Sequence, residues 1–431
     1  MGPDPHLENE MTQIKTLYEH FKSHPQISTD SRQIAAGSLF FALKGASFDG
    51  NRFAADALEK GAAYAIIDNP KIAEKHPEWR DRFVVVNDTL SALQALAREH
   101  RRALGIPILA IAGSNGKTTT KELTAAVLER DRKIYATRGN LNNHIGVPLT
   151  LLAMTPEIEF GIVEMGASAC GEIALLCSIA EPDYGLLTNI GRAHLDGFGG
   201  PEGIRRGKGE LFDFLALHNG RAFVPQEDTT LNEMAQERKG LQVESYSTRL
   251  AEGVEHQLEG DFNRLNIAAA MAVGRFFGVS EESIRSAIAA YTPSNHRSQR
   301  MERARNTLIL DCYNANPSSM AASLGHFGQE PLGEKSRKAI ILGDMLELGN
   351  WSHEEHIRIL KQALSIPEVE IFLVGPHFTE AHAALGAPAQ STCYPSRHQL
   401  VEALQHHPID QALILIKGSH SIGLEHLTEI L

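Results

Sequence analysis

The stretch GSNGKTTTKE, residues 113–122, combines glycines, a lysine and a run of threonines at the spacing of a phosphate-binding loop. It follows the apolar run IPILAIAG and precedes the helical pattern TTTKELTAAVLER, which is the strand–loop–helix setting that such a loop requires. Backbone N–H groups and the positive end of the helix would hold phosphate oxygens. Lys117 would reach the outer phosphates, and Thr118 would offer its hydroxyl to Mg²⁺. The sequence therefore predicts a nucleoside triphosphate site.

The loop departs from the common pattern in one respect. Its first glycine is Gly113, whereas the common pattern has a glycine five residues before Gly116, where this chain has Ile111. The alternative interpretation is an ordinary strand-to-helix turn rich in Gly and Asn. We favour phosphate binding, because Gly-Lys-Thr-Thr after a buried strand seldom arises from turn chemistry alone.

Polar side chains follow two further apolar runs. GIVEMGAS places Glu164 at the end of one strand, and LLTNIGRAHLDGFGG places Thr188, Asn189 and His194 just beyond another. Ligands bind at the carboxyl ends of parallel strands in this architecture. Glu164 could then serve a Mg²⁺ ion held by phosphates, and His194 could be a metal ligand. Taken alone, each side chain could equally be a solvated loop residue.

Two other stretches carry chemical groups that are ambiguous by themselves. GIRRGKGELF places Lys208 on an expected helix, and a lone helix lysine is usually solvated, so a functional Lys208 would have to be explained by its neighbours. TRGNLNNHIGVPLTLL contains Asn140, Asn142 and Asn143 before a glycine and a proline. Asparagine is a common loop residue, but this many amide groups could also bind a polar sugar or phosphate.

The elements that must position these residues fall into three segments. Strand-like runs alternate with helical patterns along most of the chain, which predicts an α/β fold with parallel sheets. A long amphipathic helix over 91–104 could bridge the first and second segments. We predict a disordered extension over 1–10, a first domain over 11–103, a central domain over 104–295 and a doubly wound third domain over 296–431.

Composition narrows the class of protein. The 431 residues are 42% hydrophobic and carry a net charge of −12, which argues against a general nucleic-acid binder. The four cysteines form no CxxC pair, as expected of reduced thiols in a cytosolic protein. No apolar run approaches the about 18 residues that a membrane helix needs. We therefore expect a cytoplasmic protein, most simply a monomer, with no nucleic-acid partner and no membrane insertion.

Several motifs, in this order and at this spacing, resemble those of the Mur ligases, the ATP-dependent amide-forming enzymes of peptidoglycan synthesis. They are GSNGKTTTKE, GNLNNHIGVPLTLL, IVEMGAS, LTNIGRAHLDGFG and KGE. LDCYNANPSSM, ILGDMLELG and ILIKGSHSI resemble the MurF type, which adds D-alanyl-D-alanine to UDP-N-acetylmuramoyl-tripeptide. The segment 29–62 resembles the N-terminal domain that receives the UDP sugar in the MurE and MurF types. The resemblance runs from about residue 28 to the end.

The resemblance implies three domains: a UDP-substrate domain, a central ATPase and a C-terminal Rossmann-like domain. It also implies that Lys117, Glu164, His194, Lys208 and Arg297 are catalytic, with Lys208 carbamylated by CO₂. Two Mg²⁺ ions would be held by Thr118, Glu164, His194 and Lys208. The implied ATP-binding residues are Gly113, Ser114, Asn115, Gly116, Lys117, Thr118, Thr119, Asn263, His296, Arg297 and Asp311. The implied substrate-binding residues are Ser31, Arg32, Lys44, Asn140, Asn142, Asn143, Ser168, Tyr313, Asn314 and Asn316.

This chain departs from the family pattern at two of these positions. Phe262 stands where the family often has a histidine before the residue that matches Asn263, and SNHRSQR, residues 294–300, differs from the more familiar MurF form. We expect the terminal carboxylate of the tripeptide to attack the γ-phosphate of ATP, giving an acyl phosphate that the amine of D-alanyl-D-alanine then attacks. Closure of the third domain onto the second would bring His296 and Arg297 over the phosphates.

Three alternatives stay open from the sequence. A MurE-type ligase would add the third amino acid, but that type carries a DNPR segment in its C-terminal domain, whereas the DNP of this chain lies at 68–70. A folate polyglutamate ligase is disfavoured by the 29–62 pattern. A nucleotide-binding regulatory protein would have no need of two metal sites and a modifiable lysine.

Overall fold

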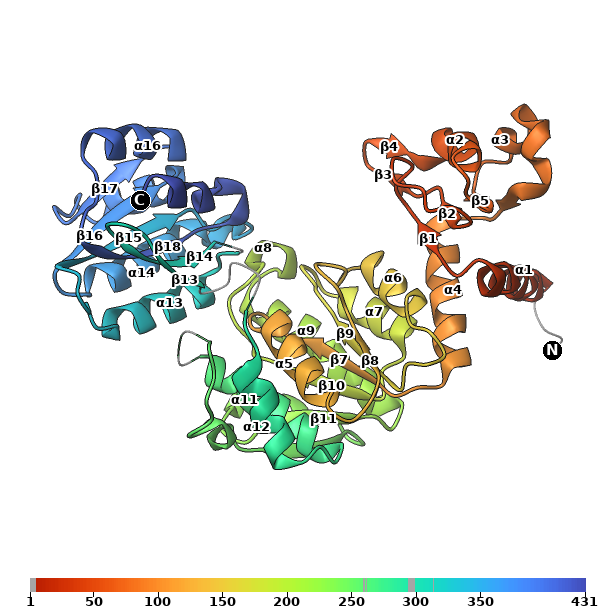
Figure 1. Cartoon of the computed structure of the whole chain (residues 1–431), viewed down its shortest axis with the longest axis horizontal. Helices are drawn as coiled ribbons and strands as arrows, with labels where there is room; N and C mark the ends of the chain where they lie inside the picture. Colours follow the sequence, from red (N-terminus) through yellow and green to blue (C-terminus); the bar gives the residue numbers. More distant parts are fainter. Residues whose placement is uncertain (1–4, 259, 261, 294–298, 313) are drawn as a thin grey trace.

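The computed structural model describes residues 5–258, 260, 262–293, 299–312 and 314–431. Figure 1 shows three bodies that follow one another along the chain. Each is built around its own mainly parallel sheet, with strand orders β1-β2-β5-β6, β12-β11-β10-β7-β9-β8 and β13-β14-β18-β15-β16-β17. The predicted α/β class with three domains is confirmed. Within the described ranges, no helix combines the length and the apolar character that a bilayer crossing needs.

The N-terminal domain is a small parallel sheet with short helices. Its elements are α1 (Pro5–Ser23), β1 (Ile27–Ser28), β2 (Leu39–Phe41), the antiparallel hairpin β3 (Lys44–Gly45) and β4 (Phe48–Asp49), α2 (Ala54–Glu59), β5 (Tyr64–Ile67), α3 (Pro70–Lys75) and β6 (Phe83–Val85). The disorder expected over residues 1–10 is wrong for residues 5–10, whose backbone forms the start of α1. No glycine or proline interrupts the chain between Pro5 and Ser23, and proline is favoured in a first helical turn.

Helix α4 (Thr89–Leu104) connects the first domain to the second, as the amphipathic pattern predicted. The Asp88 side chain caps its start by accepting from Ser91 N at 2.7 Å, and Gly105 ends it in the left-handed region at φ 63°. Toward the central domain, His100 Nε2 lies 2.8 Å from the Met154 carbonyl. On its other side, Nδ1 of His100 lies 3.3 Å from the Tyr18 hydroxyl of α1. The helix is therefore held from both sides.

The central domain follows next in the chain. Its elements are β7 (Ile108–Ala112), α5 (Lys117–Leu128), β8 (Ile134–Ala136), α6 (Gly146–Leu152), β9 (Phe160–Glu164), α7 (Glu172–Ala180), β10 (Tyr184–Leu187), α8 (Leu195–Phe198), α9 (Pro201–Leu217), β11 (Arg221–Pro225), α10 (Thr229–Gln236), β12 (Gln242–Tyr246), α11 (Asn263–Phe276) and α12 (Glu281–Ala290). Every strand pair in its sheet is parallel.

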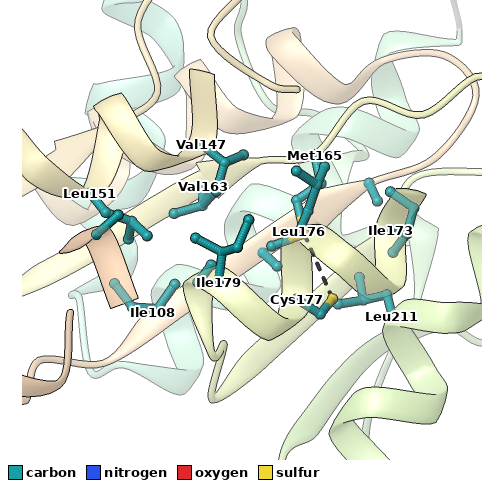
Figure 2. Packing of buried hydrophobic residues seen from close by; sticks show 14 of the residues in the cluster. Ile108, Val147, Leu151, Val163, Met165, Ile173, Leu176, Cys177, Ile179 and Leu211 are labelled. Atoms are coloured by element: carbon teal, nitrogen blue, oxygen red, sulfur yellow. Dashed lines mark hydrogen bonds between the residues drawn. The ribbon is translucent and has the colours of Figure 1, made fainter. Parts of the chain in front are cut away.

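Apolar side chains cover both faces of the central sheet. On one face, Ile108 of β7 and Val163 of β9 pack against side chains of α6 and α7, among them Leu176 and Cys177 of α7 (Figure 2). The other face packs against α5 and α11. Full burial of one such aliphatic side chain contributes roughly 1.5–3 kcal/mol. This double cover explains why the strands are continuous apolar runs, and it fixes the strand ends that carry the polar groups.

The C-terminal domain is a second doubly wound unit. Its elements are β13 (Gln299–Glu302), β14 (Thr307–Asp311), α13 (Pro317–Gln329), β15 (Arg337–Gly343), α14 (Ser352–Leu364), β16 (Val369–Val374), α15 (Pro376–Ala384), β17 (Ser391–Tyr394), α16 (Arg397–His406) and β18 (Ala412–Lys417). All its strand pairs are parallel except the antiparallel edge pair β13–β14. Leu195 and Phe198 of the central domain belong to the same apolar cluster as Met345 and Leu348, so the two domains share a packed contact.

Candidate active site

A cavity of about 940 Å³ lies between the central and C-terminal domains. It is lined by the segments that follow β7, β9 and β10 in the central domain, together with residues at the ends of β14 and β18 and in the first turns of α13. These are the carboxyl ends of parallel strands, where doubly wound sheets bind their ligands. The polar residues predicted from strand ends therefore do converge on one space.

The loop between β7 and α5 has a backbone that requires its glycines. Gly113 has φ +130°, and a Cβ there would lie 2.1 Å from Thr188 Oγ1. Gly116 has φ +80°, and a Cβ there would lie 2.5 Å from Asn266 Oδ1. Any larger residue would be strained and would also collide with a neighbouring polar side chain. Gly113 thus serves as the first glycine of the loop, although it stands later than in the common pattern.

Two side chains after β10 brace this loop. Thr188 Oγ1 donates to the Asn115 carbonyl at 2.6 Å, and Asn189 Nδ2 donates to the same carbonyl at 2.9 Å. Asn189 Oδ1 in turn accepts from Asn115 N at 3.1 Å. Ser114 Oγ both donates to the Gly191 carbonyl and accepts from Gly191 N, at 3.0 and 2.9 Å. The loop conformation is therefore set before any phosphate arrives.

Lys117 is the first residue of α5, where unpaired backbone N–H groups create a positive potential. Its ammonium group donates to the carbonyls of Gly113 and Ser114 at 2.9 and 3.1 Å, so the side chain folds along the loop. Thr118 and Thr119 follow on the cavity wall, and Thr118 is buried. Lys117 and the helix end together present a preformed anion site.

Glu164, the last residue of β9, is 2% exposed and lines the cavity. Its Oε1 accepts from Asn142 Nδ2 at 2.8 Å, and its backbone N–H donates to Thr137 Oγ1 at 2.9 Å. Its Oε2 is buried without a hydrogen-bond partner, and the nearest cation is Lys121 Nζ at 3.8 Å. An orphaned carboxylate oxygen facing a phosphate site is the donor that a hard divalent cation accepts. The residues present therefore fit Mg²⁺.

Among the residues that the structure describes, no three His, Cys, Asp or Glu side chains gather in a group able to hold a metal ion on their own. An ion at Glu164 would therefore complete its coordination with oxygens of the nucleotide and water, as Mg²⁺ commonly does.

His194 follows β10 and adopts the left-handed region, at φ 54°, immediately before the short helix α8. Its Nδ1 contacts Oε2 of Glu347, which belongs to the C-terminal domain. Burial lowers the pKa of His194 against the opposing effect of the Glu347 carboxylate, and the charges of Lys208 and Lys117 act in the same direction as burial. His194 lines the same cavity as Lys117.

Lys208 lies on α9 and is 1% exposed. Its Nζ donates to the Ala167 carbonyl at 2.9 Å and lies 5.0 Å from the centre of the Phe198 ring. Burial, reinforced by the charge of Lys117, lowers the pKa of Lys208 to about 7. A buried lysine without a carboxylate contact is unusual. Lys208 is therefore not the solvated lysine that is usual on a helix surface.

The C-terminal wall of the cavity contains a buried ion pair. Lys417, the last residue of β18, is 1% exposed, and its Nζ lies 2.5 Å from Asp311 Oδ2 at the end of β14. The same carboxylate oxygen accepts from Ser323 Oγ at 2.9 Å, and Lys417 also donates to the Asn314 carbonyl at 3.3 Å. Asp311, Asn314 and Lys417 all line the cavity.

Asn316 joins the two domains directly. Its side chain caps α13 by accepting from Ser319 N at 2.9 Å. Its Nδ2 also donates to Asn115 Oδ1 of the phosphate loop at 2.7 Å, and Asn115 Nδ2 lies 3.4 Å from Asn316 Oδ1. Asn316 is not among the cavity-lining residues, and its contacts make it a bridge between domains. The predicted residues His296, Arg297 and Tyr313 lie outside the described residues.

Other predicted residues divide between the cavity and the protein surface. Asn263 lines the cavity, and its Oδ1 accepts from Asn266 Nδ2 at 2.8 Å. Asn143 lines the cavity, and its Oδ1 accepts from Gly146 N, at the start of α6, at 2.9 Å. Ser168 lines the cavity with its N–H bonded to a carboxylate on α7, whereas Asn140 is exposed and away from the lining.

Three predicted substrate residues lie in the N-terminal domain and not at this cavity. Lys44 Nζ pairs with Asp68 Oδ1 at 2.8 Å, and Arg32 pairs with Asp30 on the surface. The Ser31 carbonyl accepts from Lys60 Nζ at 2.8 Å. These contacts of the three residues lie within the N-terminal domain, and none of them reaches the phosphate loop.

Four residues that build the site were not singled out from the sequence. They are Lys121, Asn266, Glu347 and Lys417. Asn266 stands three residues after Asn263 on one helix face and accepts from Thr120 Oγ1 at 3.0 Å, so its spacing offered a signal. The others are single charged residues whose partners come from distant segments, and only the folded chain reveals them.

Comparison with known families agrees with this geometry. Residues 25–101 match the Mur ligase family, catalytic domain, and residues 111–253 match the Mur ligase middle domain. Residues 296–420 match the Mur ligase, glutamate ligase domain. The three matches fall on the three bodies of the structure.

Relatives match over almost the whole chain. The UDP-N-acetylmuramoyl-tripeptide–D-alanyl-D-alanine ligase of Bacillus subtilis is 32% identical, covering 94% of this chain and 92% of its own length. The enzyme of the same name from Synechocystis is 34% identical, covering 97% and 94%.

Solved structures give the same result. A crystal structure of MurF from Acinetobacter baumannii superimposes with a TM-score of 0.82 at 31% identity, covering 94% of this chain and 92% of that one. MurF ligase from Thermotoga maritima, in complex with ADP, gives a TM-score of 0.79 at 26% identity, covering 94% and 96%. The chain therefore belongs to the Mur ligase family, within the group of UDP-N-acetylmuramoyl-tripeptide–D-alanyl-D-alanine ligases.

Proposed function

We propose that the protein is an ATP-dependent ligase that joins D-alanyl-D-alanine to UDP-N-acetylmuramoyl-tripeptide, releasing ADP and phosphate in the synthesis of the peptidoglycan precursor. The observation that carries the proposal is the convergence of a preformed phosphate loop, an orphaned oxygen of Glu164 and His194 on one interdomain cavity. The buried Lys208 bonds to the carbonyl of Ala167, which lines the same cavity. Relatives that carry this name align over 92–94% of their own lengths.

ATP would bind with its phosphates on the loop 113–118. The N–H groups at the start of α5 and the ammonium of Lys117 would receive the β- and γ-phosphates after Lys117 leaves its loop carbonyls. Asn263 and Tyr291 line the cavity from the central domain, and Asp311 lines it from the C-terminal domain, which suits contacts to the base and the ribose. The nucleotide would thereby bridge both domains.

The chemistry has to provide a leaving group for a carboxylate oxygen. The tripeptide carboxylate attacks the γ-phosphorus, the bond from that phosphorus to the β–γ bridging oxygen breaks, and ADP departs. The ammonium group of D-alanyl-D-alanine loses one proton to become a neutral amine, whose nitrogen then attacks the acyl carbon. A second proton leaves the nitrogen, and the tetrahedral intermediate expels inorganic phosphate. Both steps concentrate negative charge, which Lys117 and the N-terminus of α5 are placed to stabilise.

Thr118, Glu164, His194 and Lys208 are the residues that would hold two Mg²⁺ ions. Bound Mg²⁺ supplies neutralisation of phosphate charge during transfer. Lys208 could hold a Mg²⁺ ion only after its amine is converted to an anion. Its pKa of about 7 leaves much of the amine neutral, and the neutral amine is the form that adds to CO₂ to give a carbamate and a proton. Mass spectrometry of the intact protein with and without bicarbonate would detect the added CO₂.

The N-terminal domain would receive the UDP sugar through the segment that carries Ser31, Arg32 and Lys44. The working unit in this proposal is a monomer. We place the reaction in the cytoplasm, where ATP is available. The Asn115–Asn316 contact gives the C-terminal domain a docking point on the phosphate loop, which supports a reaction that proceeds with the domains closed.

The test is a ligation assay with ATP, Mg²⁺, UDP-N-acetylmuramoyl-tripeptide and D-alanyl-D-alanine, read by phosphate release and product mass. A parallel reaction contains the UDP-dipeptide and a diamino acid. The proposal predicts turnover in the first mixture only, with the mass gain of one dipeptide less water. Turnover in the second mixture alone would move the assignment to a MurE-type ligase, and ATP binding without turnover in either would favour a regulatory protein.

A further inference from the structure

The cavity carries a lysine on each of its two walls, and this raises a problem for the second substrate. Lys117 lies on the central-domain wall, and Lys417 lies on the opposite wall. These charges suit phosphates. A dipeptide, however, arrives with its amino group protonated as an ammonium ion at neutral pH. A cation entering this space needs an anionic group near the reacting carbon.

Most acidic residues that line the cavity are already bonded to protein donors. Glu164 accepts from Asn142, Glu172 accepts from Ser168 N, and Asp311 is paired with Lys417.

Glu347 differs from these acids in its contacts. Its side chain is 64% exposed, and its Oε2 contacts His194 Nδ1 across the domain boundary. Among the described residues, no protein donor bonds to its other oxygen, Oε1. Glu347 therefore offers a charged acceptor to the cavity.

The backbone around Glu347 is fixed from both sides. Met345 N donates to His356 Nε2 at 3.0 Å, and Leu346 N donates to Ser419 Oγ at 3.1 Å. Leu348 is buried in the apolar cluster that it shares with Leu195 of α8. Glu347 itself has φ +61°, a conformation that L residues seldom adopt outside over-determined and often functional segments. Its carboxylate is thus held in a defined place.

We propose that Glu347 is a specificity-determining residue that binds the protonated amino group of the incoming dipeptide and holds it beside the acyl phosphate. This rests on the proposed ligase function and goes beyond it by naming the group that selects an amine. Glu347 contacts His194, and both line the same cavity as Lys117 and the phosphate loop, so an amine bound there lies near the transferred phosphoryl group. The carboxylate also counters the positive charge that would otherwise repel the ammonium ion.

The test separates amine binding from the earlier chemistry. Glu347→Gln keeps the shape of the side chain and removes its charge, and Glu347→Asp keeps the charge on a shorter arm. Glu354→Gln, at an exposed position on α14, is the matched control. Steady-state kinetics give KM for D-alanyl-D-alanine, ATP and the UDP-tripeptide. In separate reactions without dipeptide, hydroxylamine, which is largely neutral at pH 7, captures the acyl phosphate as a hydroxamate.

For Glu347→Gln we expect KM for the dipeptide to rise roughly 10- to 100-fold, the range that the loss of one hydrogen bond to a charged group gives. KM for ATP and hydroxamate formation should stay within about twofold of wild type. The dipeptide KM of Glu347→Asp should lie between those of wild type and Glu347→Gln, and the dipeptide KM of Glu354→Gln should match wild type.

A dipeptide KM within twofold of wild type would overturn the proposal, as would a hydroxamate rate that falls in proportion to ligation. If wild type forms neither hydroxamate nor ligated product, the proposed ligase function falls, and this assignment falls with it.

Discussion

Replacing Lys208 with methionine should make the ligand-free protein more stable and abolish ligation. Burial lowers the pKa of Lys208 from 10.5 to about 7. That difference, at about 1.4 kcal/mol per pKa unit, means that the buried lysine destabilises the folded state by about 5 kcal/mol at low pH. Methionine removes this penalty but also loses the contact of the ammonium with Phe198, about 1 kcal/mol. We expect a net gain near pH 7 of about 3–4 kcal/mol.

The pH dependence of this gain has a defined sign. The folded-state pKa of Lys208 lies below the unfolded-state value, so the unfolded chain binds the proton more tightly. The penalty is therefore nearly full below about pH 7, falls as pH rises toward 10.5, and vanishes above it. Between pH 7 and pH 9.5 the advantage of the methionine variant should shrink by about 3 kcal/mol.

Calorimetry in CO₂-free buffer at both pH values measures the effect, because a carbamate would remove the lysine charge. One kcal/mol shifts Tm by roughly 2–4 °C in a domain of this size. We expect the Tm of Lys208→Met to exceed that of wild type by roughly 10 °C at pH 7 and to differ little from it at pH 9.5. Lys239→Met, at an exposed position in the same domain, should leave Tm unchanged at both. A lower Tm at pH 7, or an equal rise at both pH values, would refute the reasoning.

Three further substitutions probe the loop and the domain contact. Lys117→Ala should raise the barrier by about 3 kcal/mol, or more than 100-fold in phosphate release, with Tm preserved; near-normal turnover would show that the loop is not the phosphate site. Asn316→Ala should remove the α13 cap and the Asn115 contact, together about 1–3 kcal/mol. Faster amide exchange in the first turn of α13 would reveal this, and unchanged exchange would contradict it. Asp311→Leu should destabilise the protein by about 3–5 kcal/mol because it leaves the Lys417 ammonium buried with only neutral acceptors. Adding Lys417→Met should recover most of that loss in thermal denaturation, and a double variant no better than the single one would argue against a buried charge pair.

The fold was accessible from sequence where burial on both faces leaves a continuous apolar run. IPILAIAG, FGIVEMG and ALILIKGS correspond to β7, β9 and β18. The edge strands β12, with the sequence QVESY, and β13, with QRME, were missed, because an edge strand is partly exposed and its sequence stays polar. The helix over residues 5–10 was missed because a polar N-terminal segment was expected to be disordered.

The site was accessible where chemistry is encoded locally. Lys117 sits in its loop motif and Glu164 at a strand end, and the structure places both on one cavity. Glu347 and Lys417 gave no such signal, because each acquires its meaning from a partner more than 100 residues away in the chain. The burial of Lys208 was equally hidden, since its helix pattern fits a solvated lysine until Phe198 and the Ala167 carbonyl are placed against it.

The central claim is that a carboxylate is activated by phosphoryl transfer before the amide forms. The most direct measurement uses UDP-N-acetylmuramoyl-tripeptide with heavy oxygen in its terminal carboxylate, incubated with the protein, ATP, Mg²⁺ and D-alanyl-D-alanine. The account predicts that each phosphate released carries one heavy oxygen atom from that carboxylate, in step with the ligated product. Ligation accompanied by unlabelled phosphate would contradict the acyl-phosphate route, and release of unlabelled phosphate without ligation would contradict the ligase itself.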